Sequence, residues 1–263
     1  MRLQEFVCCP KCKRNLQAHA EYYMCVECSL KYPIVDGVVD FLPSNSVEKG
    51  RGQRLMESEK MVEIYESKWW RGCKLFKLYL KISLDDEIAL IKKIAKTGPA
   101  DRVLDLACGP GVFTRPFAVE SADREVIGFD LSWPMLRYAT AKVKRCGIEN
   151  IAFMHGDAHN LPLKDSSIDV ANCCGALHIF KDIRQVLSEL NRVIKPNGRF
   201  SAALCLRSSN AFNRLKASLD EKFWGIHYFR EEEFKELLDE AGFEPTVYHA
   251  KGIWMIAGGV CRP

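Results

Sequence analysis

The sequence contains no long hydrophobic run. None of its segments approaches the roughly 20 consecutive apolar residues that a membrane-spanning helix needs. The N-terminal stretch from Met1 to Val7 also has no apolar core of the kind found in secretory signal peptides. We therefore expect a cytoplasmic protein without a transmembrane segment.

A large excess of charge is also missing. The chain has 38 Lys and Arg residues and 34 Asp and Glu residues, which gives a formal net charge of +4 at pH 7. This is well short of the basic balance expected of a dedicated nucleic-acid coat protein, although it neither requires nor excludes an RNA partner. At 263 residues and 48% hydrophobic content, the chain can hold one full α/β domain and a small appendage.

Cysteine, by contrast, is abundant near the N-terminus. Cys9 and Cys12 form one Cys-x2-Cys pair, and Cys25 and Cys28 form a second pair after a gap of twelve residues. This spacing lets four thiolates surround one tetrahedral zinc ion, and a site with four cysteine ligands is coordinatively closed. About 40 residues can hardly fold alone, so metal binding would supply the missing stability. We predict a zinc-ribbon domain over residues 1–43 with structural Zn²⁺.

The other eight of the 12 cysteines are scattered through apparent core segments. Free cysteine behaves as a small and often buried hydrophobe, so this pattern favours a reducing compartment over a disulfide framework. Cys8 lies beside the first pair and could compete with Cys9, but the Cys-Pro-x-Cys form favours Cys9 as the ligand.

A polar linker is expected over residues 44–60, followed by the main domain over residues 61–263. From Leu55 to about Ile82 the pattern turns helical, with apolar residues on one face and Lys74, Lys77 and Lys81 on another. We interpret this as a core-facing helix with a solvated back. A helix that faces a membrane surface or RNA is the alternative.

A glycine-rich turn follows a short apolar run. Residues 103–108 have the length and composition of a strand, and Gly109-Pro-Gly111 comes directly afterwards, before a possible helix over residues 112–121. Glycines at such a turn let a ligand approach the backbone closely. The next predicted strand, residues 125–129, ends in Asp130, whose carboxylate could accept both hydroxyls of a ribose. This much would also suit a dehydrogenase, but the third glycine of the dinucleotide-binding fingerprint is missing.

Four motifs in order resemble those of class I S-adenosylmethionine-dependent methyltransferases. The first is residues 105–111, with Ala107 where many members have glycine. The second is residues 130–136 and the third is residues 156–162. The fourth is a strand that begins at Ser167 and runs through residues 172–179. After it, residues 189–198 resemble the helix and turn that precede the family's fifth strand, here residues 199–204. The last helix, residues 234–242, precedes a strand from Val247 onward, so that the resemblance spans about residues 60–260.

The resemblance implies an α/β fold with a doubly wound, mostly parallel seven-stranded sheet, a Rossmann-like methyltransferase fold. Ligands of such sheets bind beyond the carboxyl ends of the strands. The resemblance also implies S-adenosylmethionine as the cofactor. In the family, an Asp of the third motif contacts the adenine amino group, and Asp157 stands at that position here. The expected cofactor-binding residues are Asp105, Ala107, Gly109, Gly111, Asp130, Leu131, Asp157, Ala158 and Cys174. Helix capping or turn formation is the structural alternative for Asp130 and Asp157.

His178, just past the fourth strand, is the candidate catalytic residue. The sulfonium methyl group is already activated, so a general base is needed only if the acceptor must lose a proton. His178 would act as that base or would shape the pocket. Further candidates for the acceptor pocket are His227, Tyr228 and Arg230, and for an aromatic lid Trp69, Trp70, Phe223 and Trp224.

Two comparisons suggest different acceptors. Residues 150–200 resemble the quinone and small-molecule branch of these methyltransferases, and a ribbon joined to such a domain resembles a group of plant and bacterial methyltransferases. The alternative is the rRNA guanine methyltransferases, which also have a four-ligand zinc module that helps hold RNA. The histidine-bearing fourth strand and the lack of a dense arginine cluster favour a small, apolar acceptor. A non-enzymatic scaffold that keeps the fold is a further alternative, which the intact glycine turn and both acids disfavour.

Overall fold

The computed structural model describes residues 3–42, 81–208 and 210–263. The expected linker over residues 44–60 lies outside these ranges. So do Trp69 and Trp70 and most of the helix expected up to Ile82. Within the described ranges, no helix is long and apolar enough to cross a membrane.

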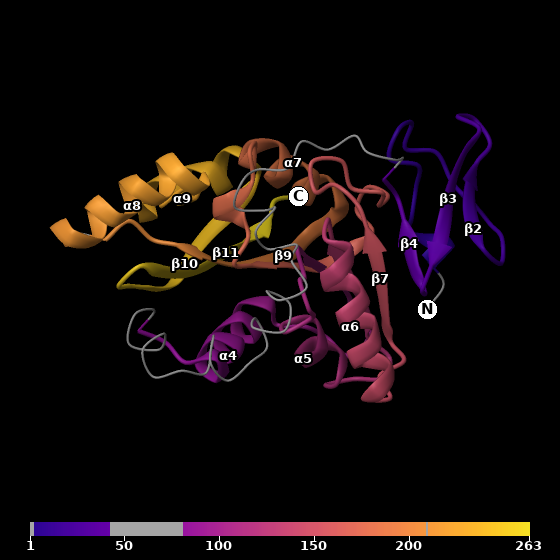
Figure 1. The fold of residues 1–263 in the computed structure, drawn as a ribbon, viewed down its shortest axis with the longest axis horizontal. Helices are drawn as coiled ribbons and strands as arrows, with labels where there is room; N and C mark the ends of the chain where they lie inside the picture. The colour runs from indigo at the N-terminus through magenta and orange to yellow at the C-terminus, as the bar shows by residue number, and fades with distance from the viewer. Residues whose placement is uncertain (1–2, 43–80, 209) are drawn as a thin grey trace.

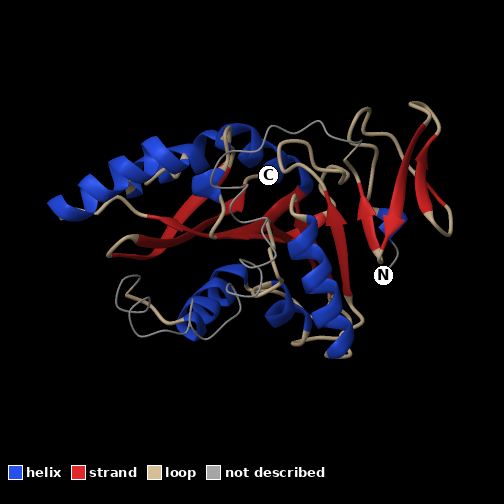
Figure 2. Cartoon of the chain, viewed as in Figure 1, coloured by secondary structure: helices blue, strands red, loops and turns tan. Residues whose placement is uncertain are grey.

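One sheet of eleven strands runs through the described part of the chain, with helices on both faces (Figure 2). Seven of these strands, in the order β7-β6-β5-β8-β9-β11-β10, form the sheet that the motifs predicted. Five of them pair in parallel with one another, namely β5 (Arg102–Leu106), β6 (Glu125–Asp130), β7 (Ile151–His155), β8 (Ile168–Cys174) and β9 (Ile194–Cys205). The doubly wound, mostly parallel α/β fold is therefore confirmed.

Two antiparallel strands complete one edge of this sheet. They are β10 (Phe243–Lys251) and β11 (Trp254–Cys261), and β11 lies between β10 and β9. The sequence indicated only one strand from Val247 onward. The chain instead reverses at Gly252, which has a φ of 67°, a conformation that glycine adopts without strain.

Four strands from the N-terminal residues extend the opposite edge. They are β1 (Gln17–Ala18), β2 (Tyr22–Cys25), β3 (Leu30–Val35) and β4 (Val38–Asp40), and each pairs antiparallel with the next. We call residues 3–42 the N-terminal ribbon. Its last strand, β4, pairs in parallel with β7, so the ribbon continues the seven-stranded sheet rather than standing apart from it (Figure 1).

The helices lie in two layers (Figure 1). One layer holds α4 (Leu84–Ala95), α5 (Thr114–Ala118) and α6 (Trp133–Arg145), and the other holds α7 (Ile183–Val193), α8 (Ala211–Trp224) and α9 (Glu231–Glu240). Two short 3-10 turns, Leu3–Glu5 and Leu177–Ile179, complete the described elements. The helix expected over residues 112–121 is shorter in the structure, where it covers only α5.

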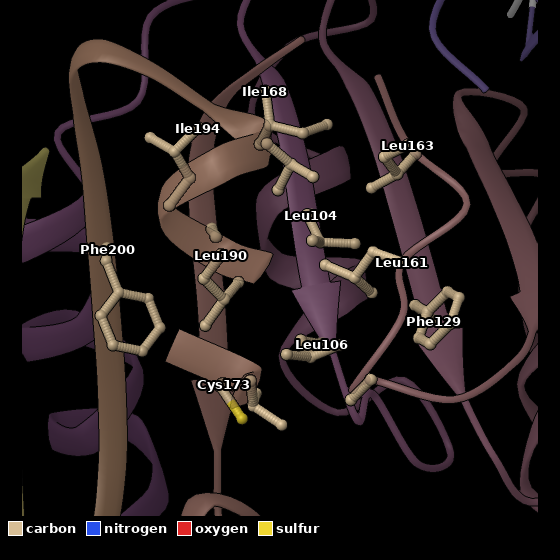
Figure 3. Packing of buried hydrophobic residues seen from close by; sticks show 14 of the residues in the cluster. Leu104, Leu106, Phe129, Leu161, Leu163, Ile168, Cys173, Leu190, Ile194 and Phe200 are labelled. Carbon is tan, nitrogen blue, oxygen red and sulfur yellow. The ribbon is translucent and has the colours of Figure 1, made fainter. Parts of the chain in front are cut away.

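Amphipathic helices and apolar strands account for the core. In α7, Asp182 caps the N-terminus by accepting a hydrogen bond from the backbone N–H of Gln185, and Leu190 is among the residues that this helix buries. Leu190 packs with Leu104 and Phe200 of the sheet in the main hydrophobic cluster (Figure 3). The strand after α7 begins at Ile194, earlier than the sequence suggested, because Ile194 already pairs with Ile168 of β8.

Candidate functional site

The glycine turn connects β5 to α5 in left-handed backbone conformations. Ala107 has a φ of 53°, Gly109 a φ of 54° and Gly111 a φ of 82°. The value at Ala107 explains why a glycine suits this position, since a left-handed conformation costs a non-glycine residue about 1–2 kcal/mol. A Cβ built on Gly109 would have no atom within 4 Å, so there is open space beside this backbone.

Asp130, at the carboxyl end of β6, is joined directly to that turn. Its Oδ2 accepts a hydrogen bond from the backbone N–H of Gly109 at 2.8 Å, and its Oδ1 accepts one from the N–H of Ser132 at 2.8 Å. Burial raises the pKa of Asp130, while these hydrogen bonds and the nearby His155 charge lower it, and the net shift is upward. Turn formation therefore occurs at Asp130, yet each carboxylate oxygen keeps a further lone pair for a ligand.

Asp105 lies beneath the turn and is 2% exposed. Its Oδ2 accepts a hydrogen bond from the Thr114 hydroxyl at 2.5 Å, and its Oδ1 accepts one from the Asn172 amide at 2.7 Å. Burial raises the pKa of Asp105 to about 6, against the lowering effect of both hydrogen bonds. The carboxylate thus ties β5 to the start of α5 and to the neighbouring strand β8. Asn172 also accepts a bond at 3.2 Å from the Cys174 thiol at the end of β8.

The loop after β7 carries Asp157 and the buried Ala158. The backbone N–H of Gly156 donates to the carbonyl of Asp130 at 3.1 Å, so this loop is joined to the end of β6. Asp157 Oδ1 accepts hydrogen bonds from both the backbone N–H and the ring Nδ1 of His159, at 3.0 and 2.6 Å. Burial raises the pKa of Asp157, but the bonds from His159 outweigh this effect and the net pKa is lowered. The buried Nε2 of His159 has no hydrogen-bond partner in the described structure and could meet a ligand.

His178 lies in the 3-10 turn after β8 and is 8% exposed. Its ring stands edge-on to the Trp254 indole, with 6.0 Å between centroids. Its carbonyl accepts a hydrogen bond from the backbone N–H of His227 at 2.7 Å. The structure thus brings His178 together with the segment before α9.

The other acceptor-pocket candidates differ in their surroundings. The Tyr228 hydroxyl donates to Asp220 of α8 at 2.8 Å, and the His227 ring faces Glu233 at 2.8 Å. Arg230 is exposed and occupies the N-cap position of α9, where its backbone N–H donates to the Glu233 carboxylate at 3.2 Å. Phe223 and Trp224, at the end of α8, are 53% and 45% exposed. Both aromatic side chains are therefore available to contact another molecule.

The predicted metal ligands converge in the N-terminal ribbon. The sulfur atoms of Cys9, Cys12, Cys25 and Cys28 all lie within 4.8 Å of one another. A tetrahedral ion with Zn–S bonds of about 2.3 Å separates its sulfurs by roughly 3.8 Å, so the cluster has the right size for zinc. Cys8 lies outside this four-cysteine group, as the Cys-Pro-x-Cys form indicated.

The four thiols differ in how readily they lose a proton, since burial raises the pKa of Cys25 and a hydrogen bond with Cys12 raises that of Cys28. Burial raises the pKa of Cys9, but hydrogen bonds from the Tyr32 hydroxyl and from the backbone N–H groups of Cys12 and Lys11 outweigh it and lower the pKa to about 7. The Tyr32 oxygen lies 3.1 Å from the Cys9 sulfur. Since the thiolate is the form that binds metal, these contacts prepare Cys9 as a ligand.

Several residues of the site were not predicted from the sequence. Thr114 and Asn172 hold Asp105, and His159 holds Asp157. His159 follows Asp157 by two residues inside the third motif, so its spacing could have indicated it. Asn172 is 67 residues from Asp105, and only the pairing of β5 with β8 brings them together.

Comparisons with known proteins agree with this geometry. Residues 103–198 match the family model described as a methyltransferase domain. The chain is 35% identical over 115 residues to the uncharacterized methyltransferase YcgJ of Bacillus subtilis, covering 44% of this chain and 45% of that protein. It is 35% identical over 118 residues to the demethylmenaquinone methyltransferase of Bacillus cytotoxicus, covering 44% of this chain and 48% of that protein. The chain thus spans about half the length of these two relatives.

A longer match extends over both parts of the chain. An uncharacterized chloroplastic methyltransferase of Arabidopsis thaliana, At2g41040, is 25% identical over 239 residues, or 87% of this chain and 67% of that protein. The crystal structure of B. subtilis YcgJ superposes with a TM-score of 0.60 and 20% identity, covering 68% of this chain and 99% of that chain. The fold is that of the class I methyltransferases, and within it residues 103–198 match a methyltransferase domain.

Proposed function

We propose that the protein transfers the methyl group of S-adenosylmethionine to a small, apolar acceptor. The observation that carries this proposal is the hydrogen bond between the Gly109 amide and the Asp130 carboxylate. It places a carboxylate that can bind a ribose beside an open glycine turn, at the carboxyl ends of two adjacent parallel strands.

Each site residue has a defined role in this proposal. Asp130 accepts hydrogen bonds from the ribose hydroxyls through the oxygen lone pairs that the Gly109 and Ser132 N–H groups do not use. Leu131 lies beside it. Asp157 and Ala158 hold the adenine. The turn at Ala107, Gly109 and Gly111 and the end of β8 at Cys174 surround the methionine part, with the buried Asp105 beneath.

Methyl transfer needs alignment more than activation. S-adenosylmethionine supplies a sulfonium methyl group, and positioning an acceptor in line with it can contribute roughly 7–11 kcal/mol. His178 and the 223–230 segment would form the acceptor side. If the acceptor is a weak acid, His178 would take its proton while the methyl carbon passes from sulfur to the acceptor atom and S-adenosylhomocysteine is left.

The proposed identity of the acceptor rests on relatives and on two exposed aromatic side chains. The demethylmenaquinone methyltransferase among the relatives supports a quinone-like acceptor. Exposed Phe223 and Trp224 near His227 would suit an apolar molecule. An RNA base, with the ribbon as the recognition module, is the alternative outcome to be tested.

We also propose that the four-cysteine cluster binds structural Zn²⁺. The sulfur spacing and the low pKa of Cys9 support this assignment. Four cysteine ligands leave no open position for a substrate, so the ion would stabilise the ribbon and take no part in methyl transfer.

The acceptor class is tested with purified protein, methyl-labelled S-adenosylmethionine and an extract of the host cells. After the reaction, the label is separated into organic-soluble and RNA fractions, and demethylmenaquinone is used in a parallel reaction as a defined probe. Label in the organic phase is expected. Label in RNA would overturn the small-acceptor proposal, and Asp130→Ala protein serves as the control for cofactor-dependent transfer.

A further inference from the structure

Three residues from three neighbouring strands lie in line across the carboxyl edge of the sheet. Asp40 of β4 pairs in register with His155 of β7, and His155 pairs in register with Asp130 of β6. The first belongs to the N-terminal ribbon and the last to the proposed cofactor site. His155 therefore stands between the two parts of the molecule.

The side chain of His155 connects both neighbours. Its Nδ1 lies 2.7 Å from Asp40 Oδ1, and its Nε2 lies 3.0 Å from the carbonyl oxygen of Leu131. A carbonyl oxygen only accepts hydrogen bonds, so Nε2 carries a proton and donates it. The carboxylate of Asp40 likewise accepts from Nδ1, which makes the bridge a charge-assisted one.

The surroundings hold this bridge in place. His155 is 6% exposed, and the Trp133 ring covers it with 4.5 Å between ring centroids. The backbone N–H of Phe41 donates to the His155 carbonyl at 2.8 Å, which fixes the end of β4 against β7. A buried, doubly bonded imidazole of this kind has little freedom to turn.

We propose that His155 is a positioning residue that holds the Asp130–Ser132 turn of the cofactor site through the Leu131 carbonyl, with Asp40 of the ribbon as its anchor. The ribbon then has a second role besides its own folding, because it sets the geometry of the turn that binds S-adenosylmethionine. This inference rests on the proposed function, since it requires the cofactor to bind at Asp130.

A second contact from the ribbon reaches the other cofactor loop. The Lys13 ammonium, next to Cys12, donates to the Asn160 side chain at 2.6 Å and to the Leu161 carbonyl at 3.1 Å. The N–H of Asn160 in turn donates to the Asp157 carbonyl at 3.1 Å. Both loops proposed to hold the nucleoside therefore touch the ribbon.

The experiment measures the affinity of the full chain for S-adenosylmethionine by calorimetry, well below the melting temperature of each variant. Asp40→Ala removes the acceptor of Nδ1, and His155→Leu removes the bridge. Each should weaken binding about tenfold, as expected for the loss of a charge-assisted hydrogen bond. Because both act through one bridge, the double variant should bind no more weakly than His155→Leu alone.

Two further variants separate positioning from general stability. In Asp40→Asn, the new amide can donate a hydrogen bond to Nδ1 of His155, and Nε2–H still donates to the Leu131 carbonyl. The affinity of this variant should therefore stay within about threefold of wild type, unlike that of Asp40→Ala. Arg137→Ala is the control. It removes an exposed ion pair between Arg137 Nε of α6 and Asp36 Oδ2 of the ribbon, 3.4 Å apart, and should change the affinity less than twofold.

Two results would overturn the inference: Asp40→Ala protein that binds like wild type, or effects of Asp40→Ala and His155→Leu that multiply in the double variant. In both cases wild-type protein still binds S-adenosylmethionine, and the proposed function stands. If the wild-type chain shows no saturable binding, the proposed function fails and this inference fails with it.

Discussion

Asp105 shows how a motif residue can serve the fold and the site at once. Both of its carboxylate oxygens are occupied by Thr114 and Asn172, and the side chain is almost fully buried. Burial raises its pKa to about 6, from an ordinary value near 3.8. At neutral pH the folded protein therefore holds a buried charge directly under the glycine turn.

This charge has a predictable effect on stability. Between about pH 4 and pH 6 the folded chain keeps a proton on Asp105 that the unfolded chain has lost, so this group makes the protein more stable as the pH falls. Above pH 6 the buried charge costs on the order of 3 kcal/mol. Asp105→Asn keeps partners for Thr114 and Asn172 and removes the charge. Its free energy of unfolding should therefore exceed that of wild type more at pH 7.5 than at pH 5.

Urea unfolding at the two pH values measures this difference. Asp123→Asn, in an exposed turn, is the control and should show no such dependence. A gain in stability that is equal at both pH values, or a variant less stable than wild type at pH 7.5, would contradict the role of burial at Asp105.

At the scale of single residues, the sequence predicted which side chains gather at the carboxyl ends of the strands better than it predicted their contacts. The spacing of Gly109, Asp130 and Asp157 indicated a nucleoside site, and the structure places all three at the ends of adjacent strands. The partners Asn172 and Asp40 could not be found, because they meet the site only through strand pairing over long sequence separations.

Among the elements, helix α4 packs closely on strands β9 and β11, near the β10 edge of the sheet. The helix begins at Ser83, whose hydroxyl accepts a hydrogen bond from the Asp86 N–H, and it packs on β9 and β11. Its Glu87 accepts a hydrogen bond from the Trp254 indole at 2.9 Å inside the core. This approach is possible because β11 has a glycine at position 258 under the helix.

Gly258→Ala should destabilise the protein by about 1–3 kcal/mol or more, because the tightly packed core has no room for the added methyl group. A Cβ there would lie 2.1 Å from the Phe200 carbonyl oxygen and 2.7 Å from Ile94 Cγ2. Adding Ile94→Ala should give no recovery, since the carbonyl contact remains. Thermal melting measures both effects, and a Gly258→Ala protein that melts like wild type would contradict this packing.

The strands near the glycine turn were easier to predict than the C-terminal hairpin. Apolar runs next to recognisable motifs marked β5, β6 and β8, whereas β10 has only one buried residue, mostly alternates half-buried and exposed positions, and has charged residues near both ends. The reversal at Gly252 and the insertion of β11 beside β9 depend on tertiary pairing, which no local pattern encodes.

At the level of the whole molecule, the ribbon and the catalytic sheet form one continuous structure. Strand β4 covers the edge of β7, and Lys13 forms an ion pair with Glu189 of α7 at 3.2 Å. If the proposed zinc ion keeps the ribbon folded, its removal would also expose the β7 edge of the sheet, and an exposed strand edge promotes aggregation.

We expect purified protein to contain one zinc ion per chain and to lose more than about 5 °C of melting temperature when a strong chelator removes it. Structural zinc contributes on the order of 10–16 kcal/mol to small zinc peptides, and about 1 kcal/mol corresponds to a shift of roughly 2–4 °C in a chain of this size. Cys25→Ser should have the same effect as the chelator. Cys146→Ser, an exposed cysteine outside the cluster, is the matched control.

Elemental analysis and thermal melting decide this point. Protein without metal that melts like the metal-bound form would contradict a structural zinc site.

The sequence predicted the ribbon and its four cysteines, but not the pairing of the ribbon with the sheet, since the three residues of β4 carry no signal for a partner more than a hundred residues away.

The most direct test of the account is a calorimetric titration of the full chain with S-adenosylmethionine. We predict saturable binding at one site per chain, loss of binding in Asp130→Ala, and unchanged binding in Asp123→Ala, whose side chain is exposed in the turn before β6. Wild-type protein that gives no binding, or Asp130→Ala protein that binds with wild-type affinity, would contradict the site and the function proposed from it.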